Sequence, residues 1–398
     1  MKRRGGENAA VAVITGTRAE FGLLRPVIDE LTNLGIPSKL LVTGSHLVDA
    51  HGRTASEIEA GGYRIEKEFD ILKNDPNTAA NIAFPRAFSA FSEYFMDAPP
   101  SIALVLGDRY ETLAAALAAE MARVPLAHIS GGDVTQGAMD DCYRHCITKL
   151  SWLHFPSTER YRERVIQLGE APERVFNVGS LGAENALKLP AIPRDELSSE
   201  LRFSFSEDYL LVTYHPETLS ETSAVEMLEQ LLTALGAVGL PVLFTGANAD
   251  DEGAVINERL VEYCSGKVDC CFINSLGTVR YLSAMRYARA LAGNSSSALV
   301  EAPMFGVPAV NIGERQRGRE MGANVINCEA DSASIEAALR KAASAEFRSA
   351  VSCSQSPYRG EGTAKKIASE IAVFLNGEES GVKKAFYDLP RRKTNEEC

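Results

Sequence analysis

The segment AVAVITGTRAEFGLLRPVIDELTNLG, residues 10–35, sets the fold expected of this chain. Its continuous apolar run at 10–15 predicts a strand buried on both faces. A turn follows at Gly16–Arg18, and the pattern from Glu20 to Leu34 predicts a helix that ends at Gly35. A buried strand followed directly by a helix indicates a parallel sheet covered by helices on both faces.

The same alternation continues along the chain and restarts near residue 181. Between the two series, residues 187–199 contain Pro190 and Pro193 and are interpreted as a linker. We therefore expect an α/β protein with two Rossmann-like, doubly wound parallel-sheet domains. Further strands are predicted at 38–43, 102–106, 125–129, 152–156 and 175–178, and then at 209–213, 242–245, 271–273, 290–292 and 309–312.

The domain boundaries follow from this pattern. We expect an N-terminal domain at 1–185, a second domain at 186–361, a helix at 362–376 and a charged, flexible tail at 377–398. Parallel sheets of this kind bind ligands at the carboxyl ends of their strands. Functional residues are therefore expected in the loops that follow strands.

The composition excludes several classes of function. A formal net charge of -12 disfavours a nucleic-acid partner. No apolar run approaches about 18 residues and the N-terminus lacks a signal-peptide core, so we expect a cytoplasmic protein without a membrane span. The eight cysteines follow no regular spacing, which favours reduced thiols over a metal site.

Two loops of the first half carry candidate functional residues. In Thr15–Gly22, free backbone N–H groups and Arg18 suit a diphosphate, although a capped turn with an exposed arginine is an equal alternative. The loop lacks the glycine pattern of NAD-binding proteins. Asp108 lies just after a predicted strand, where a catalytic carboxylate is expected, with Glu111 one turn further on; helix capping is the alternative role of Asp108.

The segment HISGGDVTQGAMDDCYRH, residues 128–145, contains the most polar groups. Asp140 and Arg144 are spaced i, i+4, as are Asp141 and His145, so each pair lies on one helix face. Such pairs can orient a carboxylate or tune a histidine, although an acidic first turn also stabilises a helix without any function. The glycine-rich loop beside them favours the functional interpretation.

Strand ends of the second half add a phosphate-binding pattern. His215 follows the predicted strand at 209–213. In Gly293–Pro303, serine hydroxyls at a helix start suit a diphosphate and Glu301 suits ribose hydroxyls, although the same loop could be an ordinary helix cap. Arg315 follows the next strand and could reach the nucleotide.

Seven segments in order resemble the hydrolysing UDP-N-acetylglucosamine 2-epimerases of bacterial sialic-acid and legionaminic-acid pathways. Each motif is weak alone, but the ordered set is specific and covers nearly the whole chain except the tail. The matching segments are GTRAEFGLL at 16–24, TGSHL at 43–47, LGDRYE at 106–111, HISGGD at 128–133, DDCYRHCITKLSWLHF at 140–155, YHPET at 214–218 and GNSSSALVEAPMFGVPAVNIGERQRGRE at 293–320.

The resemblance implies a GT-B fold with an interdomain cleft, the helix at 362–376 packing back on the first domain, and a homodimer or homotetramer. It implies no cofactor and no metal. The catalytic candidates are Asp108, Asp133, Asp140, Asp141 and His215, and the candidates for binding the nucleotide sugar are Arg18, His46, Arg144, His145, Ser295, Ser296, Glu301 and Arg315.

One departure from the family pattern concerns the acid and base roles. Some relatives have glutamate at the position of Ser130, so Asp133 or Asp141 would replace that carboxylate here. The sequence leaves open whether the base is uracil or guanine, and whether the sugar is N-acetylglucosamine or a 2,4-diacetamido-trideoxy sugar. A non-hydrolysing epimerase, a GT-B glycosyltransferase and an inactive nucleotide-sugar sensor are competing interpretations of the same motifs.

Overall fold

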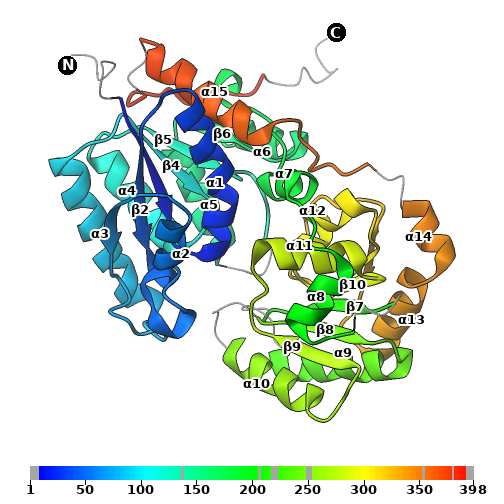
Figure 1. Ribbon diagram of the computed structural model, residues 1–398. Coiled ribbons are helices and arrows are strands. Elements are labelled where there is room, and N and C mark those ends of the chain that lie inside the picture. The colour runs from blue at the N-terminus through cyan, green and yellow to red at the C-terminus, as the bar shows by residue number, and fades with distance from the viewer. Residues whose placement is uncertain are drawn as a thin grey trace, which may run out of the picture. The chain divides into compact units, whose positions relative to one another are not determined.

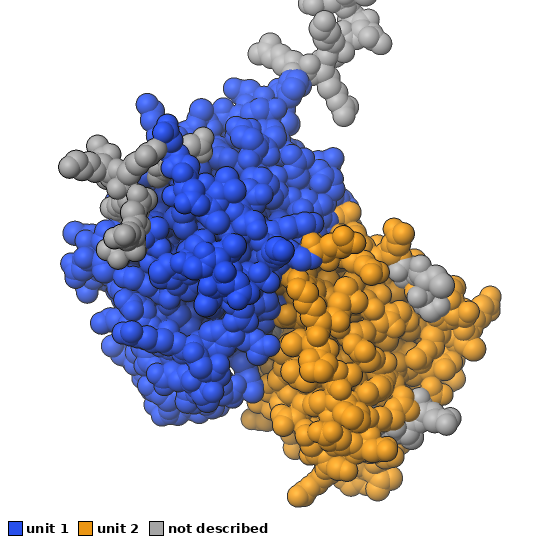
Figure 2. All heavy atoms as spheres, turned by 45° about the horizontal axis from the view of Figure 1, so that its top comes forward, with its two compact units in different colours: residues 1–133, 142–178, 362–398 blue, residues 134–141, 179–361 orange. Residues whose placement is uncertain are grey.

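The computed structural model describes residues 9–135, 139–204, 208–216, 223–247, 253–351, 355–378 and 381–390. The chain forms two compact units, coloured separately in Figure 2. Unit 1 comprises residues 1–133, 142–178 and 362–398, and unit 2 comprises residues 134–141 and 179–361. Each unit is built on one sheet, so the expected pair of Rossmann-like domains is confirmed.

The sheet of unit 1 has six strands in the order β3-β2-β1-β4-β5-β6, all paired in parallel. Strand β1 lies at its centre and all five of its residues are buried, as expected for a strand covered on both faces. The strands are β1 (Val11–Thr15), β2 (Ser38–Thr43), β3 (Ile65–Phe69), β4 (Ile102–Leu106), β5 (Leu126–Ile129) and β6 (Leu153–Phe155).

Helices cover the sheet of unit 1 (Figure 1). Helices α3 and α4 pack on each other and on one face, while α1 packs on β1, β2 and α15. The helices are α1 (Arg18–Asn33), α2 (Ala55–Ala60), α3 (Ala80–Asp97), α4 (Tyr110–Met121), α5 (Asp140–Leu150, whose first two residues cluster with unit 2), α6 (Glu159–Gln167) and α15 (Thr363–Asn376), with short 3-10 turns η1 (Gly44–Leu47), η2 (Asp49–His51) and η3 (Pro172–Arg174).

Unit 2 repeats this design with the strand order β12-β11-β10-β7-β8-β9. Its strands are β7 (Leu210–Thr213), β8 (Val242–Thr245), β9 (Cys270–Ile273), β10 (Ala290–Gly293), β11 (Ala309–Ile312) and β12 (Val325–Cys328). Its helices are α7 (Leu181–Lys188), α8 (Arg194–Leu201), α9 (Ala224–Val238), α10 (Gly253–Cys264), α11 (Gly277–Tyr287), α12 (Ser297–Val300), η4 (Ala302–Phe305), α13 (Ser332–Ala342) and α14 (Ala345–Val351).

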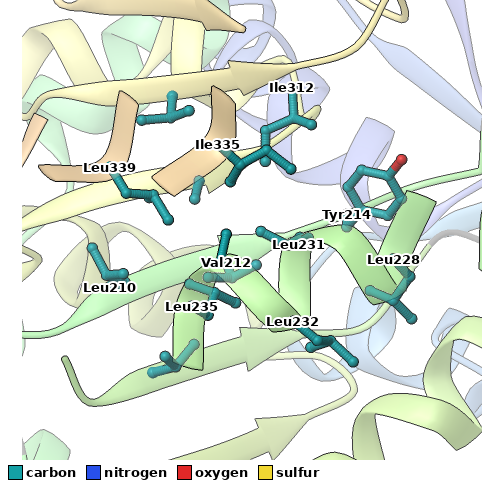
Figure 3. Packing of buried hydrophobic residues seen from close by; sticks show 14 of the residues in the cluster. Leu210, Val212, Tyr214, Leu228, Leu231, Leu232, Leu235, Ile312, Ile335 and Leu339 are labelled. Carbon is teal, nitrogen blue, oxygen red and sulfur yellow. The ribbon is translucent and has the colours of Figure 1, made fainter. Parts of the chain in front are cut away.

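Helices α9 and α13 form the core of unit 2 against the sheet (Figure 3). Leu228, Leu231 and Leu235 recur at helical spacing on α9 and belong to one buried cluster with Leu210 and Val212 of β7. Ile335 and Leu339 of α13 join the same cluster. This packing fixes the strands whose carboxyl ends carry the polar loops of unit 2.

Three expectations about single elements were wrong or incomplete. Residues 175–178 form no strand: Val175 makes only an isolated bridge to His154. Strands β3 and β12 were not predicted: β3 exposes Glu66, Lys67 and Glu68 and so lacks an apolar run, and the four-residue β12 is interrupted by Asn327. The predicted linker at 187–199 contains the end of α7 and most of α8.

The C-terminal segment packs on unit 1. Thr363 at the start of α15 donates a hydrogen bond to the carbonyl of Val178 over 2.8 Å. Beyond the helix lies a segment of the tail that the sequence leads us to expect as flexible. There, Lys384 reaches the buried carboxylate of Glu170, and Tyr387 N–H donates to the carbonyl of Gly169 over 2.9 Å. Within the described ranges, no helix is long and apolar enough to cross a membrane.

Candidate functional site

At the carboxyl edge of the unit 1 sheet, two carboxylates share one buried guanidinium. Asp108 follows β4 and forms an ion pair with Arg144 of α5. Asp133 follows β5, and its Oδ2 lies 3.9 Å from Nη1 of the same arginine. The side chain of Arg144 is only 4% exposed. The structure therefore brings together three residues that the sequence singled out separately.

This arrangement has a direct electrostatic reason. A guanidinium taken out of water must be compensated by opposite charge, and the two aspartates provide it. Ser157 also donates a hydrogen bond to Asp133 Oδ1 over 3.3 Å, which fixes the second carboxylate. Carboxylates held in this way can accept a proton from a substrate carbon.

Asp140 and Asp141 begin α5, but the structure gives them different surroundings. Asp141 Oδ1 accepts a hydrogen bond of 2.6 Å from the backbone N–H of Thr135, so it holds the preceding loop. Asp140 is half-buried and lies four residues before Arg144, on the same face of the helix. His145, which follows Arg144, is also half-buried. Arg319 of unit 2 holds the same loop through the Val134 carbonyl and the Thr135 hydroxyl.

The sequence did not single out His128 as a positioning residue. It lies on β5 and is fully buried, with Nε2 2.7 Å from the carbonyl of Gly107 and Nδ1 3.2 Å from the hydroxyl of Thr148. It thus connects the turn that carries Asp108 to helix α5. Burial lowers the pKa of His128 to about 3, so the ring stays neutral at ordinary pH.

Replacing His128 by glutamine is expected to remove a specific pH dependence of stability. Below pH 6.5 the unfolded chain binds a proton at His128, but the native state does not until about pH 3. Native stability from this group is thus lost as the pH falls through that window, by up to about 1.4 kcal/mol per pH unit. Urea unfolding at pH 7, 6 and 5 should show the difference between wild-type and His128→Gln shrinking by about 0.7 kcal/mol from pH 7 to 6 and by about 1.2 kcal/mol from pH 6 to 5.

Because other titrating groups are common to both proteins, they cancel in this difference. Thr148→Val is the matched control, since it removes the hydroxyl at Nδ1 without removing the titrating ring. It should lower stability by a similar amount at every pH. A His128→Gln difference that does not change with pH contradicts the neutral, buried histidine.

The predicted anion loop after β1 is partly occupied by its own side chains. The N–H of Gly16 donates to Glu20 Oε2 over 2.7 Å, and the N–H of Glu20 donates to Thr17 Oγ1 over 3.2 Å. These two N–H groups are therefore not free for a phosphate, which corrects the expectation from sequence. Arg18 is exposed and forms a surface ion pair with Glu57 over 3.0 Å.

His46 is buried in η1 beside this loop. Its Nε2 lies 3.0 Å from Thr15 Oγ1 and its Nδ1 lies 2.7 Å from Thr54 Oγ1. Burial lowers the pKa of His46 to about 4. With both nitrogens engaged, this histidine orients the end of β1, and direct contact with a ligand would require it to give up one of these bonds.

In unit 2, Asn294 organises the predicted nucleotide-binding residues. Its buried side chain accepts a hydrogen bond from the N–H of His215 and donates one to the His215 carbonyl, both over 2.8 Å. Its carbonyl accepts from Arg315 Nη1 over 3.2 Å and from Gln316 over 2.7 Å. The loops after β7, β10 and β11 thus meet at one asparagine, which sequence reasoning passed over.

The close approach of these loops depends on Gly293. Its φ is +128°, and a Cβ there would overlap the carbonyl of Thr213. Ser295 and Ser296 follow it and are half-buried, with Ser295 Oγ 3.0 Å from Ser297 Oγ. The helix that starts after these serines is short: α12 ends at Val300, and the 3-10 turn η4 follows it.

Glu301 lies at the end of α12, against the start of α7. A Cβ at Gly182 would overlap its Oε1. Burial raises the pKa of Glu301 to about 7, and Arg319 partly offsets this effect. A carboxylate in this position can accept hydrogen bonds from two neighbouring hydroxyls, as the ribose interpretation requires.

Some sequence-based expectations fall outside these clusters. Glu217 and Thr218 of the YHPET segment lie outside the described residues. Among the residues that the structure describes, no cluster of His, Cys, Asp or Glu could hold a metal ion, and the described cysteines are free thiols.

Comparison with known proteins identifies the family. The model of the UDP-N-acetylglucosamine 2-epimerase family matches residues 30–372. The chain is 38% identical to the GDP/UDP-N,N'-diacetylbacillosamine 2-epimerase (hydrolyzing) of Campylobacter jejuni, over 85% of this chain and 88% of that one. It is 37% identical to the polysialic acid biosynthesis protein P7 of Escherichia coli, over 97% of this chain and 99% of that one.

A solved structure shows the same fold at low sequence identity. The UDP-GlcNAc 2-epimerase of Methanocaldococcus jannaschii, in complex with UDP-GlcNAc and UDP, aligns with a TM-score of 0.74 and 16% identity, covering 92% of this chain and 100% of that one. The GT-B-like arrangement of two parallel sheets expected from the resemblance is thereby confirmed. With most of its length matched by the family model, this chain belongs to the UDP-N-acetylglucosamine 2-epimerase family.

Proposed function

We propose that this protein is a hydrolysing 2-epimerase of a UDP-linked N-acetylamino sugar. The observation that carries the proposal is the pair of aspartates, Asp108 and Asp133, held on the buried Arg144. Carboxylates fixed in this way suit removal of a weakly acidic proton from carbon. Unit 2 supplies a separate set of polar groups around Asn294 that suits the nucleotide.

The first step takes the proton from the sugar carbon that bears the acetamido group. A carboxylate of unit 1 accepts this proton, and the electron pair of the C2–H bond forms the C1–C2 double bond. The C1–O bond breaks and its electrons leave with the nucleoside diphosphate. Asp108 and Asp140 are the proposed acid–base residues, with Asp133 in the role of the glutamate that Ser130 replaces.

The second step adds water across the double bond of the resulting glycal. The hydroxyl adds to C1. C2 receives a proton on the face opposite to the one from which the first proton was removed, so the product is a free sugar inverted at C2. Arg18, His215, Ser295 and Arg315 are the proposed partners of the diphosphate, whose charge grows as the bond breaks. Glu301 is the proposed acceptor for ribose hydroxyls.

The relatives support two candidate sugars. The Campylobacter jejuni relative is named for diacetylbacillosamine, and a Neisseria meningitidis relative, 29% identical, is named for UDP-N-acetylglucosamine. Both sugars carry the acetamido group at C2 that the proposed chemistry needs. Comparing nucleotide sugars that differ in the substituent at C4 and in the nucleotide base will identify the substrate.

The decisive experiment incubates the protein with UDP-GlcNAc and with UDP- and GDP-linked 2,4-diacetamido sugars in deuterated water. NMR should show a free sugar inverted at C2 and carrying deuterium there, together with the nucleoside diphosphate. An inverted sugar that stays attached to its nucleotide would instead identify a non-hydrolysing epimerase. Deuterium-free product would contradict proton removal at C2.

The same samples distinguish a hydrolysing epimerase from a glycosyltransferase and from a nucleotide-sugar sensor. A glycosyltransferase of the same fold needs an acceptor, so release of free sugar without an acceptor argues against it. A sensor would bind the nucleotide sugar without turnover, which calorimetry alongside NMR would reveal.

A further inference from the structure

Behind the Thr15–Arg18 loop of unit 1, two buried carboxylates face a single guanidinium. Arg109 Nε lies 2.6 Å from Glu111 Oε1 and 3.9 Å from Glu20 Oε1. The carboxylate side chains are only 2% and 11% exposed. Two carboxylates shielded from water therefore share one guanidinium whose side chain is 36% exposed, so charge on both carboxylates would be only partly balanced.

Only one oxygen of the Glu111 carboxylate is hydrogen-bonded, since Oε1 accepts from Arg109 Nε. The Oε2 atom of Glu111 is buried and has no hydrogen-bond partner. The other oxygen packs on the loop backbone: a Cβ at Gly16 would lie 2.7 Å from Oε1, and one at Gly44 would lie 3.2 Å from it. The carboxylate is therefore packed directly behind the loop that carries Arg18, with one buried oxygen that has no hydrogen-bond donor.

Glu20 completes the cluster on the other side of Gly16, whose N–H it accepts over 2.7 Å. Burial raises the pKa of Glu20 to about 7, with the charge of Glu111 adding to the effect and Arg109 opposing it. Three of the charged groups around Glu20 follow β4: Asp108 and Arg109 precede α4, and Glu111 lies in its first turn. The others are His46 of η1, which is neutral above about pH 4, and Arg18 of α1 with its partner Glu57 of α2.

We propose that Glu20, next to Glu111, takes up a proton when a nucleoside diphosphate binds to the Thr15–Arg18 loop. The inference rests on the proposed function, in which Arg18 of this loop is one of the partners of the diphosphate. An incoming anion adds negative charge next to a pair that is already one charge in excess, so a proton from solvent joins a carboxylate oxygen. Protonation also weakens the hold of Glu20 on the Gly16 N–H, which then becomes available to a phosphate oxygen.

The expected result is a net proton uptake that calorimetry can count. UDP-glucose is the probe, because its diphosphate has no titration of its own near neutral pH and it lacks the acetamido group. The heats measured at pH 7 in HEPES and in Tris differ by the number of protons taken up multiplied by the difference between the ionisation enthalpies of the two buffers. A group with a pKa of about 7 is half protonated at that pH, so uptake of up to about half a proton is expected.

Matched variants locate the proton. Glu20→Gln and Glu111→Gln keep the shape of the cluster and should each reduce the uptake to near zero. Glu120→Gln is the control, since Glu120 is an exposed carboxylate on the same helix α4 and should leave the uptake unchanged. Infrared difference spectra of wild-type protein should show a protonated carboxyl appearing with UDP-glucose and missing in Glu20→Gln.

Equal heats in the two buffers, with UDP-glucose bound, would overturn the proton uptake and leave the proposed function intact. Uptake that persists in both glutamine variants would also overturn it, because the proton would then reside elsewhere. No binding of UDP-glucose, together with no turnover of any nucleotide-linked amino sugar by NMR, would overturn the inference and the proposed function together.

Discussion

Replacing Asp108 by asparagine is expected to lower kcat by about 10²–10⁴-fold, the usual contribution of a positioned acid or base. Asparagine keeps the size of the side chain but cannot accept the proton from C2. It also leaves Arg144 with one carboxylate fewer, so its position should be maintained mainly by Asp133. Nucleotide binding should survive, because the groups around Asn294 belong to unit 2.

The measurement is release of UDP from the preferred nucleotide sugar, alongside calorimetric affinity for UDP. Asp140→Asn should reduce turnover by a similar order, since Asp140 is the second proposed acid–base residue. Asp97→Asn, at an exposed aspartate that ends α3, is the matched control and should keep normal kcat. Near-normal turnover in both Asp108→Asn and Asp140→Asn would remove the carboxylate assignment.

The central strands could be predicted from sequence because their burial dictates their composition. Strands β1, β4 and β7 are apolar along their length and are flanked by helices, so periodicity identified them. The edge strands β6 and β9 are mostly apolar and were predicted as well. The edge strand β3 exposes Glu66, Lys67 and Glu68 to solvent, so in the sequence it resembles a polar loop.

The candidate site could be predicted only where a residue follows a strand or shares a helix face. Asp108, His215 and Arg315 were found in this way. The groups that hold them are ordinary in sequence: Asn294 lies in a serine-rich loop and His128 lies within a strand. Their roles depend on contacts between residues far apart in the chain, which spacing along a single sequence does not encode.

A second large effect is expected at the C-terminal segment, where Lys384→Met should destabilise the native state by about 3 kcal/mol. Glu170 is fully buried, and its carboxylate is bound by Lys384 at 2.9 Å, Lys149 at 2.6 Å and His154 at 3.1 Å. Burial alone would raise the pKa of Glu170, but these partners together lower it to about 2. The carboxylate thus stays charged and depends on them.

Urea unfolding at pH 7 measures the effect, with Lys383→Met as the matched control. Lys383 is an exposed neighbour, so its loss should change stability by less than about 0.5 kcal/mol. We expect Lys384→Met to destabilise the protein because it leaves the buried Glu170 carboxylate without this charged partner. In that case the double variant Lys384→Met/Glu170→Gln should lose less free energy of unfolding than the two single variants lose in total. Additive effects would show that Lys384 acts instead through its hydrogen bond to the Ser151 carbonyl, or through packing of its stem. The cycle therefore separates the charge of Lys384 from its contacts, and it decides whether the tail neutralises a buried acid or only covers the surface around it.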